Sequence, residues 1–156
     1  MANVDENKLV VKFKKLHPDA KVPVRMRQGD GAYDLSCIKG NTVLDDRITK
    51  FNTGIAVAIP EGYVGLIWCR GGLGMKGLDV HGGVIDSNYR GEIIVGLSSQ
   101  CDSVTIKDGD RVAQLIIQKS EEVDFVEVDD LENTNRGQSG FGSSDYLKQY
   151  QDPIQG

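Results

Sequence analysis

Residues 53–69, TGIAVAIPEGYVGLIWC, decide the fold class of this chain. Two short runs rich in β-branched residues, 53–59 and 63–69, flank Pro60-Glu61-Gly62, which is typical of a tight turn. Neither run repeats apolar residues at the three- and four-residue spacing of an amphipathic helix. This stretch therefore predicts two β-strands joined by a turn.

The same pattern of short strands and turns continues on both sides of this stretch. The remaining candidate strands are 8–16, 32–38, 41–44, 83–86, 92–99, 103–106, 111–119 and 124–128. Gly, Asn and Asp separate most of them. About ten short strands predict an all-β fold, a jelly-roll-like β-barrel.

Two segments depart from this rhythm. Residues 70–83, RGGLGMKGLDVHGG, are dense in glycine and predict an internal loop, and the polar tail after Val128 has little to bury. We expect a barrel domain over 1–128 and a mobile C-terminal arm over 129–156; on composition alone, the tail is equally a disordered end. Residues 8–27 are basic and 121–132 acidic, which favours solvated strand faces over docking patches.

Composition excludes several classes of protein. The 156 residues suit one domain, and the net charge of −5 argues against direct DNA binding through a general basic face. Three widely spaced cysteines predict reduced thiols rather than disulfides or a zinc site. No secretory signal and no membrane-spanning run is found in the sequence, so we expect a soluble protein of the cytoplasm or another intracellular compartment, without membrane contact.

Three glycine-containing stretches carry the residue types that phosphate chemistry needs. RGGLG (70–74) combines an arginine with backbone that a ligand can approach closely, although the pattern also suits a hairpin loop. In GGVIDSNYRG (82–91), Asp86 follows a buried strand, where it either acts as a general base or only opens a turn. RGQSGFGSS (136–144) holds an arginine, hydroxyls and one aromatic ring in a segment with no core.

Two polar residues lie within otherwise apolar strands and need hydrogen-bond partners. They are Asp34 in GAYDLS (31–36) and Gln114 in RVAQLI (111–116). His17 and His81 are the only histidines, and they give no credible catalytic triad or zinc-deaminase pattern.

Taken in order, GAYDLS, RGGLG, GGVIDSNYRGEI, RVAQLI and RGQSGFGSS resemble the five motifs of the trimeric dUTPase family. The resemblance runs over residues 9–144 and includes HPDAKVP (17–23). It implies hydrolysis of dUTP to dUMP and pyrophosphate by a homotrimer with active sites shared between subunits. It also implies Mg²⁺ as cofactor, held chiefly by the phosphates and water.

The resemblance also implies roles for individual residues. Asp86 matches the general base that activates the attacking water, and Asp34 an indirect metal contact through water. The matched phosphate contacts are Arg70, Gln114, Arg136, Ser143 and Ser144, together with the backbone of Gly71, Gly72 and Gly142. Tyr89 matches the ring that lies against deoxyribose, Gly83 and Ile94 the main chain that pairs with uracil, and Phe141 the ring that covers it.

One residue departs from the family pattern. The family's second motif reads Pro-Arg-Ser-Gly, and its serine hydroxyl donates to the oxygen between the α- and β-phosphorus; here Gly71 takes the place of that serine. A dUTP-binding regulatory protein with weak catalysis is therefore the alternative hypothesis. The related dCTP deaminases place a catalytic Glu in a T-L-E run after the third motif, which GEIIVGL (91–97) lacks.

Overall fold

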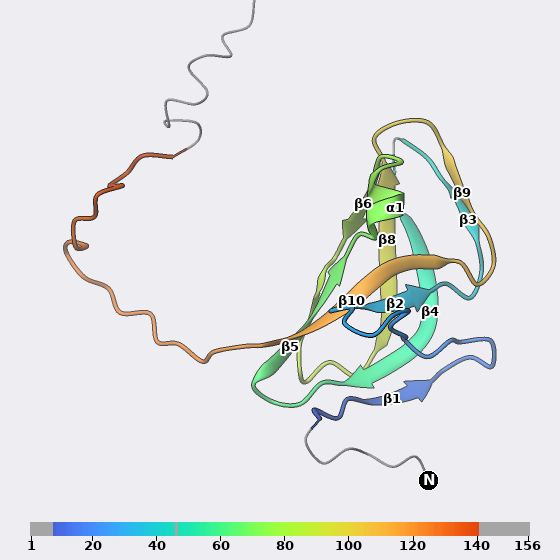
Figure 1. The fold of residues 1–156 in the computed structure, drawn as a ribbon, viewed down its shortest axis with the longest axis horizontal. Helices are drawn as coiled ribbons and strands as arrows, with labels where there is room; N and C mark the ends of the chain where they lie inside the picture. The colour runs from blue at the N-terminus through green and yellow to red at the C-terminus, as the bar shows by residue number, and fades with distance from the viewer. Residues whose placement is uncertain (1–7, 46, 141–156) are drawn as a thin grey trace, which may run out of the picture. The chain divides into compact units, whose positions relative to one another are not determined.

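The computed structural model describes residues 8–45 and 47–140 of the chain. Within these residues the chain is built almost entirely of short strands (Figure 1). The elements are β1 (Lys12–Lys15), β2 (Tyr33–Ser36), β3 (Asn41–Val43), β4 (Thr49–Ala58), β5 (Tyr63–Trp68), α1 (Gly71–Gly74), β6 (Leu78–His81), β7 (Val84–Ile85), β8 (Glu92–Ser99), β9 (Val104–Ile106) and β10 (Arg111–Lys119).

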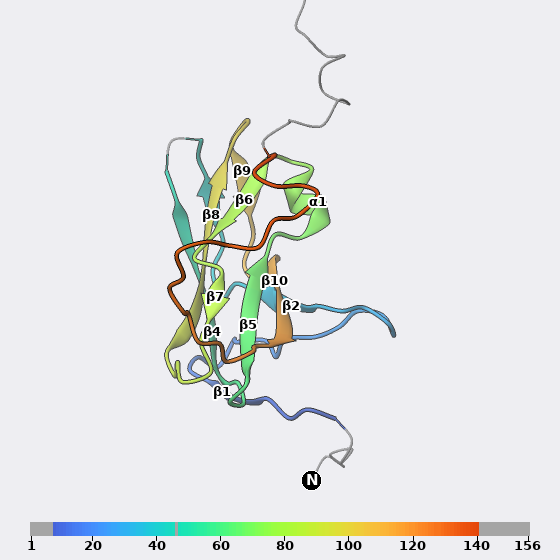
Figure 2. The same ribbon diagram turned by 90° about the vertical axis from the view of Figure 1, so that its left-hand side faces the viewer.

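The strands form two four-stranded antiparallel sheets and a two-stranded ribbon. The first sheet has the order β1-β4-β8-β6, the second has the order β2-β10-β5-β7, and β3 pairs with β9. Figure 2 shows the two larger sheets from the side. The all-β prediction is confirmed; the described strands make two four-stranded sheets and a two-stranded ribbon rather than one closed barrel.

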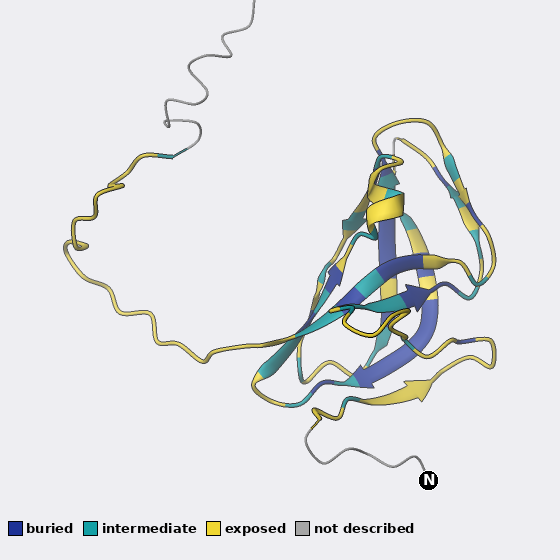
Figure 3. Cartoon of the chain, in the orientation of Figure 1, coloured by how far each residue is buried: buried dark blue, intermediate teal, exposed yellow. Residues whose placement is uncertain are grey.

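The hydrophobic core draws on both sheets (Figure 3). Side chains alternate between the two faces of a strand, so Ile93, Val95 and Leu97 of β8 are buried while Ile94 between them is 43% exposed. Leu35 of β2 and Val112 and Leu115 of β10 contribute from the second sheet. The strands that carry Asp34 and Gln114 are therefore anchored by their buried neighbours.

The Pro60-Glu61-Gly62 turn forms as the sequence predicts, but it joins two sheets rather than two paired strands. Tyr63 N–H donates to the Pro60 carbonyl at 3.2 Å, and Gly62 has a φ of +79°. The chain leaves β4 in the first sheet and enters β5 in the second. Such crossings connect the two sheets around the core.

Two expectations about secondary structure are wrong. The glycine-rich stretch 70–83 contains α1 and β6, because Leu78 is buried in the core and anchors a strand that pairs with β8. The expected strand 124–128 is extended chain without a partner in the described structure, and Phe125 is 97% exposed.

The chain divides into two compact units, Met1–Glu122 and Val123–Gly156. All of the core lies in the first unit. No helix among the described residues has the length and apolar character needed to cross a membrane.

Candidate active site

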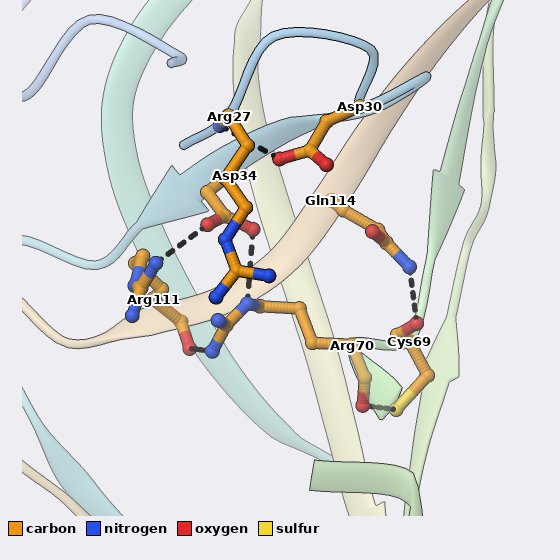
Figure 4. Close-up of polar contacts among 7 residues, drawn as sticks. All are labelled: Arg27, Asp30, Asp34, Cys69, Arg70, Arg111 and Gln114. Atoms are coloured by element: carbon orange, nitrogen blue, oxygen red, sulfur yellow. Dashed lines mark hydrogen bonds and ion pairs between the residues drawn. The ribbon is translucent and has the colours of Figure 1, made fainter. Parts of the chain in front are cut away.

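Asp34 is the centre of a charged cluster on the second sheet (Figure 4). Its Oδ1 accepts a hydrogen bond from Arg70 Nε at 2.9 Å, and its Oδ2 accepts one from Arg111 Nη1 at 2.9 Å. The Asp34 side chain is only 13% exposed. Two charge-assisted bonds in a partly buried site hold both guanidinium groups in fixed positions.

Strand register brings these three residues together. Asp34 of β2 lies opposite Gln114 of β10, and Gln114 in turn lies opposite Trp68 near the end of β5. Arg70 follows β5, and Arg111 begins β10. Three adjacent strands of one sheet thus unite stretches that are far apart in the sequence.

Gln114 fixes the backbone next to Arg70. Its Nε2 donates to the Cys69 carbonyl at 2.8 Å, which satisfies a polar side chain among apolar neighbours. Arg70 Nη1 also donates to the Arg111 carbonyl at 3.4 Å. The amide of Gln114 therefore positions the end of β5 from which α1 begins.

A cavity of about 660 Å³ opens beside this cluster. Arg70, Asp34 and Gln114 line it, and so do Gly71 and Gly72 at the start of α1. A Cβ added at either glycine would meet no atom within 4 Å, so the glycine side of the cavity is open. Arginine side chains and accessible backbone suit an anionic ligand such as phosphate.

Cys69 lies next to the cluster, and its thiol is engaged with the backbone. Its Sγ donates to the Leu78 carbonyl at 3.2 Å. Burial, together with the nearby charge of Asp79, raises the pKa of the Cys69 thiol, so the reactive thiolate is disfavoured at neutral pH.

Asp86 lies away from this cavity. It follows β7 and lines a separate depression with Ser87, Asn88 and Glu61. Ile85 pairs with Gly65 of β5, so Asp86 is level with Val64, six residues before Arg70. At about 3.3 Å per residue, the two residues are roughly 20 Å apart along the strand. A single chain does not bring the candidate base to the candidate phosphate site.

The turn after Asp86 is well defined. Tyr89 N–H donates to the Asp86 carbonyl at 3.1 Å, so Asp86 opens a turn. The Tyr89 hydroxyl donates to the Glu92 carbonyl at 3.0 Å, and its ring remains partly exposed. The Tyr89 ring is therefore held in place while part of its surface remains exposed.

Gly83 and Ile94 lie where the chain passes from one sheet to the other. His81 pairs with Gly96, and continuing that register places Gly83 level with Ile94. The chain changes sheets at Gly82, which has a φ of +74°, and Ile67 N–H then donates to the Gly83 carbonyl at 2.7 Å. A Cβ at Gly83 would lie 3.0 Å from the Ile67 carbonyl oxygen, so this close approach favours glycine.

The fifth motif begins in the second unit. Arg136 Nε donates to the Ser139 carbonyl at 3.0 Å within a local turn. Phe141, Gly142, Ser143 and Ser144 lie outside the described residues.

Two further arginines, Arg111 and Arg27, line the cavity and are not among the site residues expected from the sequence. Arg111 directly precedes the buried part of β10. A charged residue at the start of an apolar strand is a sequence signal that could have indicated Arg111 as a site residue. Arg27 lies in a loop whose path only the fold reveals.

These features define an all-β protein with an arginine-lined cavity beside three adjacent strands of one sheet. The dUTPase family model matches residues 18–145. The chain belongs to the dUTPase family.

Individual relatives agree with this assignment. The chain is 41% identical over 149 residues to a deoxyuridine 5'-triphosphate nucleotidohydrolase of Corynebacterium diphtheriae, covering 92% of this chain and 98% of that protein. It is 44% identical over 138 residues to the enzyme of the same name from Swinepox virus, covering 87% and 97%. Among solved structures, the dUTPase of Staphylococcus bacteriophage 80alpha with dUPNHPP superposes with a TM-score of 0.80 at 27% identity, covering 86% of this chain and 98% of that one.

Proposed function

We propose that this chain hydrolyses dUTP to dUMP and pyrophosphate, by in-line attack of water on the α-phosphorus. Family membership and relatives named deoxyuridine 5'-triphosphate nucleotidohydrolase support the reaction. The single observation that carries it in this structure is the Asp34–Arg70–Arg111 cluster at the edge of an open cavity. It presents fixed positive charge where a triphosphate enters.

Arg70 is the central phosphate-binding side chain in this proposal. Asp34 acts as a positioning residue, because it holds the Arg70 guanidinium at a fixed angle. Gln114 acts through the Cys69 carbonyl or directly on phosphate, and the backbone of Gly71 and Gly72 lies within reach of the same ligand.

Mg²⁺ would be bound chiefly by the triphosphate. The described residues contain no group of three or more His, Cys, Asp or Glu side chains arranged to hold a metal, and this fits an ion whose ligands are phosphate oxygens and waters. Each Asp34 oxygen already accepts one guanidinium but keeps further lone pairs for a metal-bound water. When bound, the ion neutralises phosphate charge.

The general base comes from a second subunit. Asp86 lies roughly 20 Å from Arg70 along β5, measured at about 3.3 Å per residue, so it cannot serve the cavity of its own chain. A homotrimer with sites shared between subunits removes this difficulty, because Asp86 of one copy then faces Arg70 of another.

Uracil would pair with main chain near Gly83 and Ile94. Thr53 of β4 donates its hydroxyl hydrogen to the Ile93 carbonyl at 2.7 Å, so the Ile93 backbone faces β4. The N–H and C=O groups of successive strand residues point to opposite sides of the strand. Those of Ile94 therefore point away from β4, to the side of β8 where β6 has ended. The Tyr89 ring would lie against deoxyribose and exclude a 2'-hydroxyl.

The C-terminal arm, residues 129–156, would close over the bound nucleotide. Arg136 would contact the γ-phosphate, Phe141 would cover uracil, and Gly142, Ser143 and Ser144 would donate to phosphate. Binding energy from these contacts would order the site and exclude water around the reacting phosphorus.

Rate then comes from positioning and charge. Asp86 removes a proton from the attacking water, while the arginines neutralise charge on the pyrophosphate that leaves. The hydroxyl that the family pattern supplies to the α–β bridging oxygen is missing at Gly71.

The proposal is tested by pyrophosphate release from dUTP, dTTP, dCTP and UTP, each with Mg²⁺ and with excess EDTA. We expect Mg²⁺-dependent release from dUTP, with dUMP as the other product and little reaction of the other three. Equal rates on dUTP and UTP, or binding of dUTP without any release, would contradict the proposal.

A further inference from the structure

A third arginine reaches the cavity from a loop outside the five motifs. Arg27 lines the same space as Arg70, Arg111 and Gln114. Figure 4 shows its guanidinium directed from the loop toward the region occupied by the other two guanidinium groups. It comes from the segment before β2, whereas Arg70 directly precedes α1.

The loop that carries Arg27 is held by its own hydrogen bonds. Arg27 N–H donates to Asp30 Oδ2 at 2.9 Å, and Asp30 N–H donates back to the Arg27 carbonyl at 3.3 Å. Gly29 supplies the φ of +94° that this turn requires. The backbone of Arg27 is therefore fixed at the edge of the cavity.

A second arginine, Arg25, stabilises the base of this loop and differs in role from Arg27. Arg25 Nη1 donates to the Asp30 carbonyl at 3.3 Å, and its guanidinium carbon lies 5.3 Å from the centre of the Tyr33 ring. That distance suits a cation–π contact. Arg25 is thus engaged in the loop itself.

The positive charge of the Arg27 guanidinium is not balanced by an ion pair within the described residues. Arg70 and Arg111 share the carboxylate of Asp34, whereas the Arg27 guanidinium makes no hydrogen bond or ion pair with any described residue. Asp30 uses a carboxylate oxygen on the Arg27 backbone. Three guanidinium groups and two carboxylates leave the lining with a net charge of +1. An anion that enters this cavity meets one arginine whose donors are uncommitted.

We propose that Arg27 is a further substrate-binding residue of this chain, which donates to non-bridging oxygens of the β- and γ-phosphates. The inference rests on the proposed function, since it assumes that the cavity receives the triphosphate. Arg27 makes the same contact before and during bond cleavage, so it lowers KM and leaves kcat nearly unchanged. The α-phosphate, which stays with dUMP, is not its partner.

The test compares Arg27→Gln with wild type in KM and kcat for dUTP, and in Kd for dUMP and for a non-hydrolysable imido analogue of dUTP. Loss of one charge-assisted contact at an open rim predicts a rise of about tenfold in KM and in Kd for the analogue. The predicted changes in kcat and in Kd for dUMP are less than about twofold. Arg27→Lys retains the charge, so we expect part of the affinity to remain.

Lys107→Gln is the matched control, because it removes one positive charge from an exposed turn that does not line the cavity. We expect wild-type KM in this variant. An unchanged analogue affinity in Arg27→Gln, an equal rise in Lys107→Gln, or an equal loss of dUMP affinity would each overturn the inference. The analogue titration measures binding without turnover, so it decides the role of Arg27 even if dUTP is not hydrolysed.

Discussion

Gly71→Ser restores the hydroxyl that the family pattern places beside the α–β bridging oxygen. Gly71 begins α1, and the preceding Arg70 has φ −76° and ψ 137°. Gly71 is not among the glycines with positive φ, and a Cβ built on it meets no atom within 4 Å. Serine therefore fits this position without strain or a clash.

The expected size of the effect follows from these observations. Serine is better than glycine inside a helix by roughly 0.5 kcal/mol, so folding should not suffer. A donor at an oxygen that gains charge in the transition state contributes on the order of 2–4 kcal/mol. The cavity is open on the side of Gly71, and a solvent water that entered it would supply part of this contribution in the wild type. We therefore expect kcat to rise by about 10- to 100-fold, with KM changed by less than about threefold.

Steady-state pyrophosphate release from dUTP measures the effect, with Gly71→Ala as the matched control. Alanine restricts the backbone as serine does but carries no hydroxyl, so its kcat should stay near that of wild type. Discrimination against dTTP should not change, because the proposed uracil pocket lies near Gly83 and Ile94. A kcat that is unchanged or lower in Gly71→Ser, or an equal rise in Gly71→Ala, would refute this reasoning.

Two further substitutions and one truncation test other parts of the site. Asp86→Asn should lower kcat by about 10²- to 10⁴-fold while calorimetry shows near-normal binding of the imido analogue, and a near-normal kcat would remove Asp86 from the role of base. Deletion from Arg136 onward should abolish most turnover and leave the thermal midpoint of unfolding unchanged, because the core lies in the first unit. A deletion variant that is unfolded in circular dichroism would instead show that the deleted segment has a structural role. Asp34→Asn should raise KM for dUTP by about tenfold and lower the stability by about 1–3 kcal/mol, because two partly buried guanidinium groups lose their carboxylate; wild-type values in both assays would exclude its positioning role.

The strands were predictable because their signals are local. Runs such as 92–99 and 111–119 are rich in β-branched residues and are bounded by turn residues, and the structure places β8 and β10 over these residues. The strand β6 was missed because the density of glycine in 70–83 hides the buried Leu78. The segment 124–128 has the composition of a strand, but a strand also needs a partner, and composition does not supply one.

Several polar residues of the cavity stood out singly in the sequence, but their arrangement did not. Asp34 and Gln114 stood out as polar residues in apolar strands, and the cross-strand pairing that joins them to Arg70 follows from register, which one sequence does not reveal. The separation of Asp86 from Arg70 has the same origin, since it depends on where β7 pairs along β5.

Mixing two inactive subunits tests the shared site most directly. Arg70→Gln and Asp86→Asn each remove one component of the proposed site, and each homotrimer should be inactive. The two variants are denatured together at equal concentration and refolded, so that mixed trimers form. In a cyclic trimer, a site that takes Arg70 from one copy and Asp86 from its neighbour is then intact with a probability of about one quarter. We predict recovery of about a quarter of wild-type pyrophosphate release from dUTP in the mixture. A mixture as inactive as its two components, although mixed trimers have formed, would contradict the account.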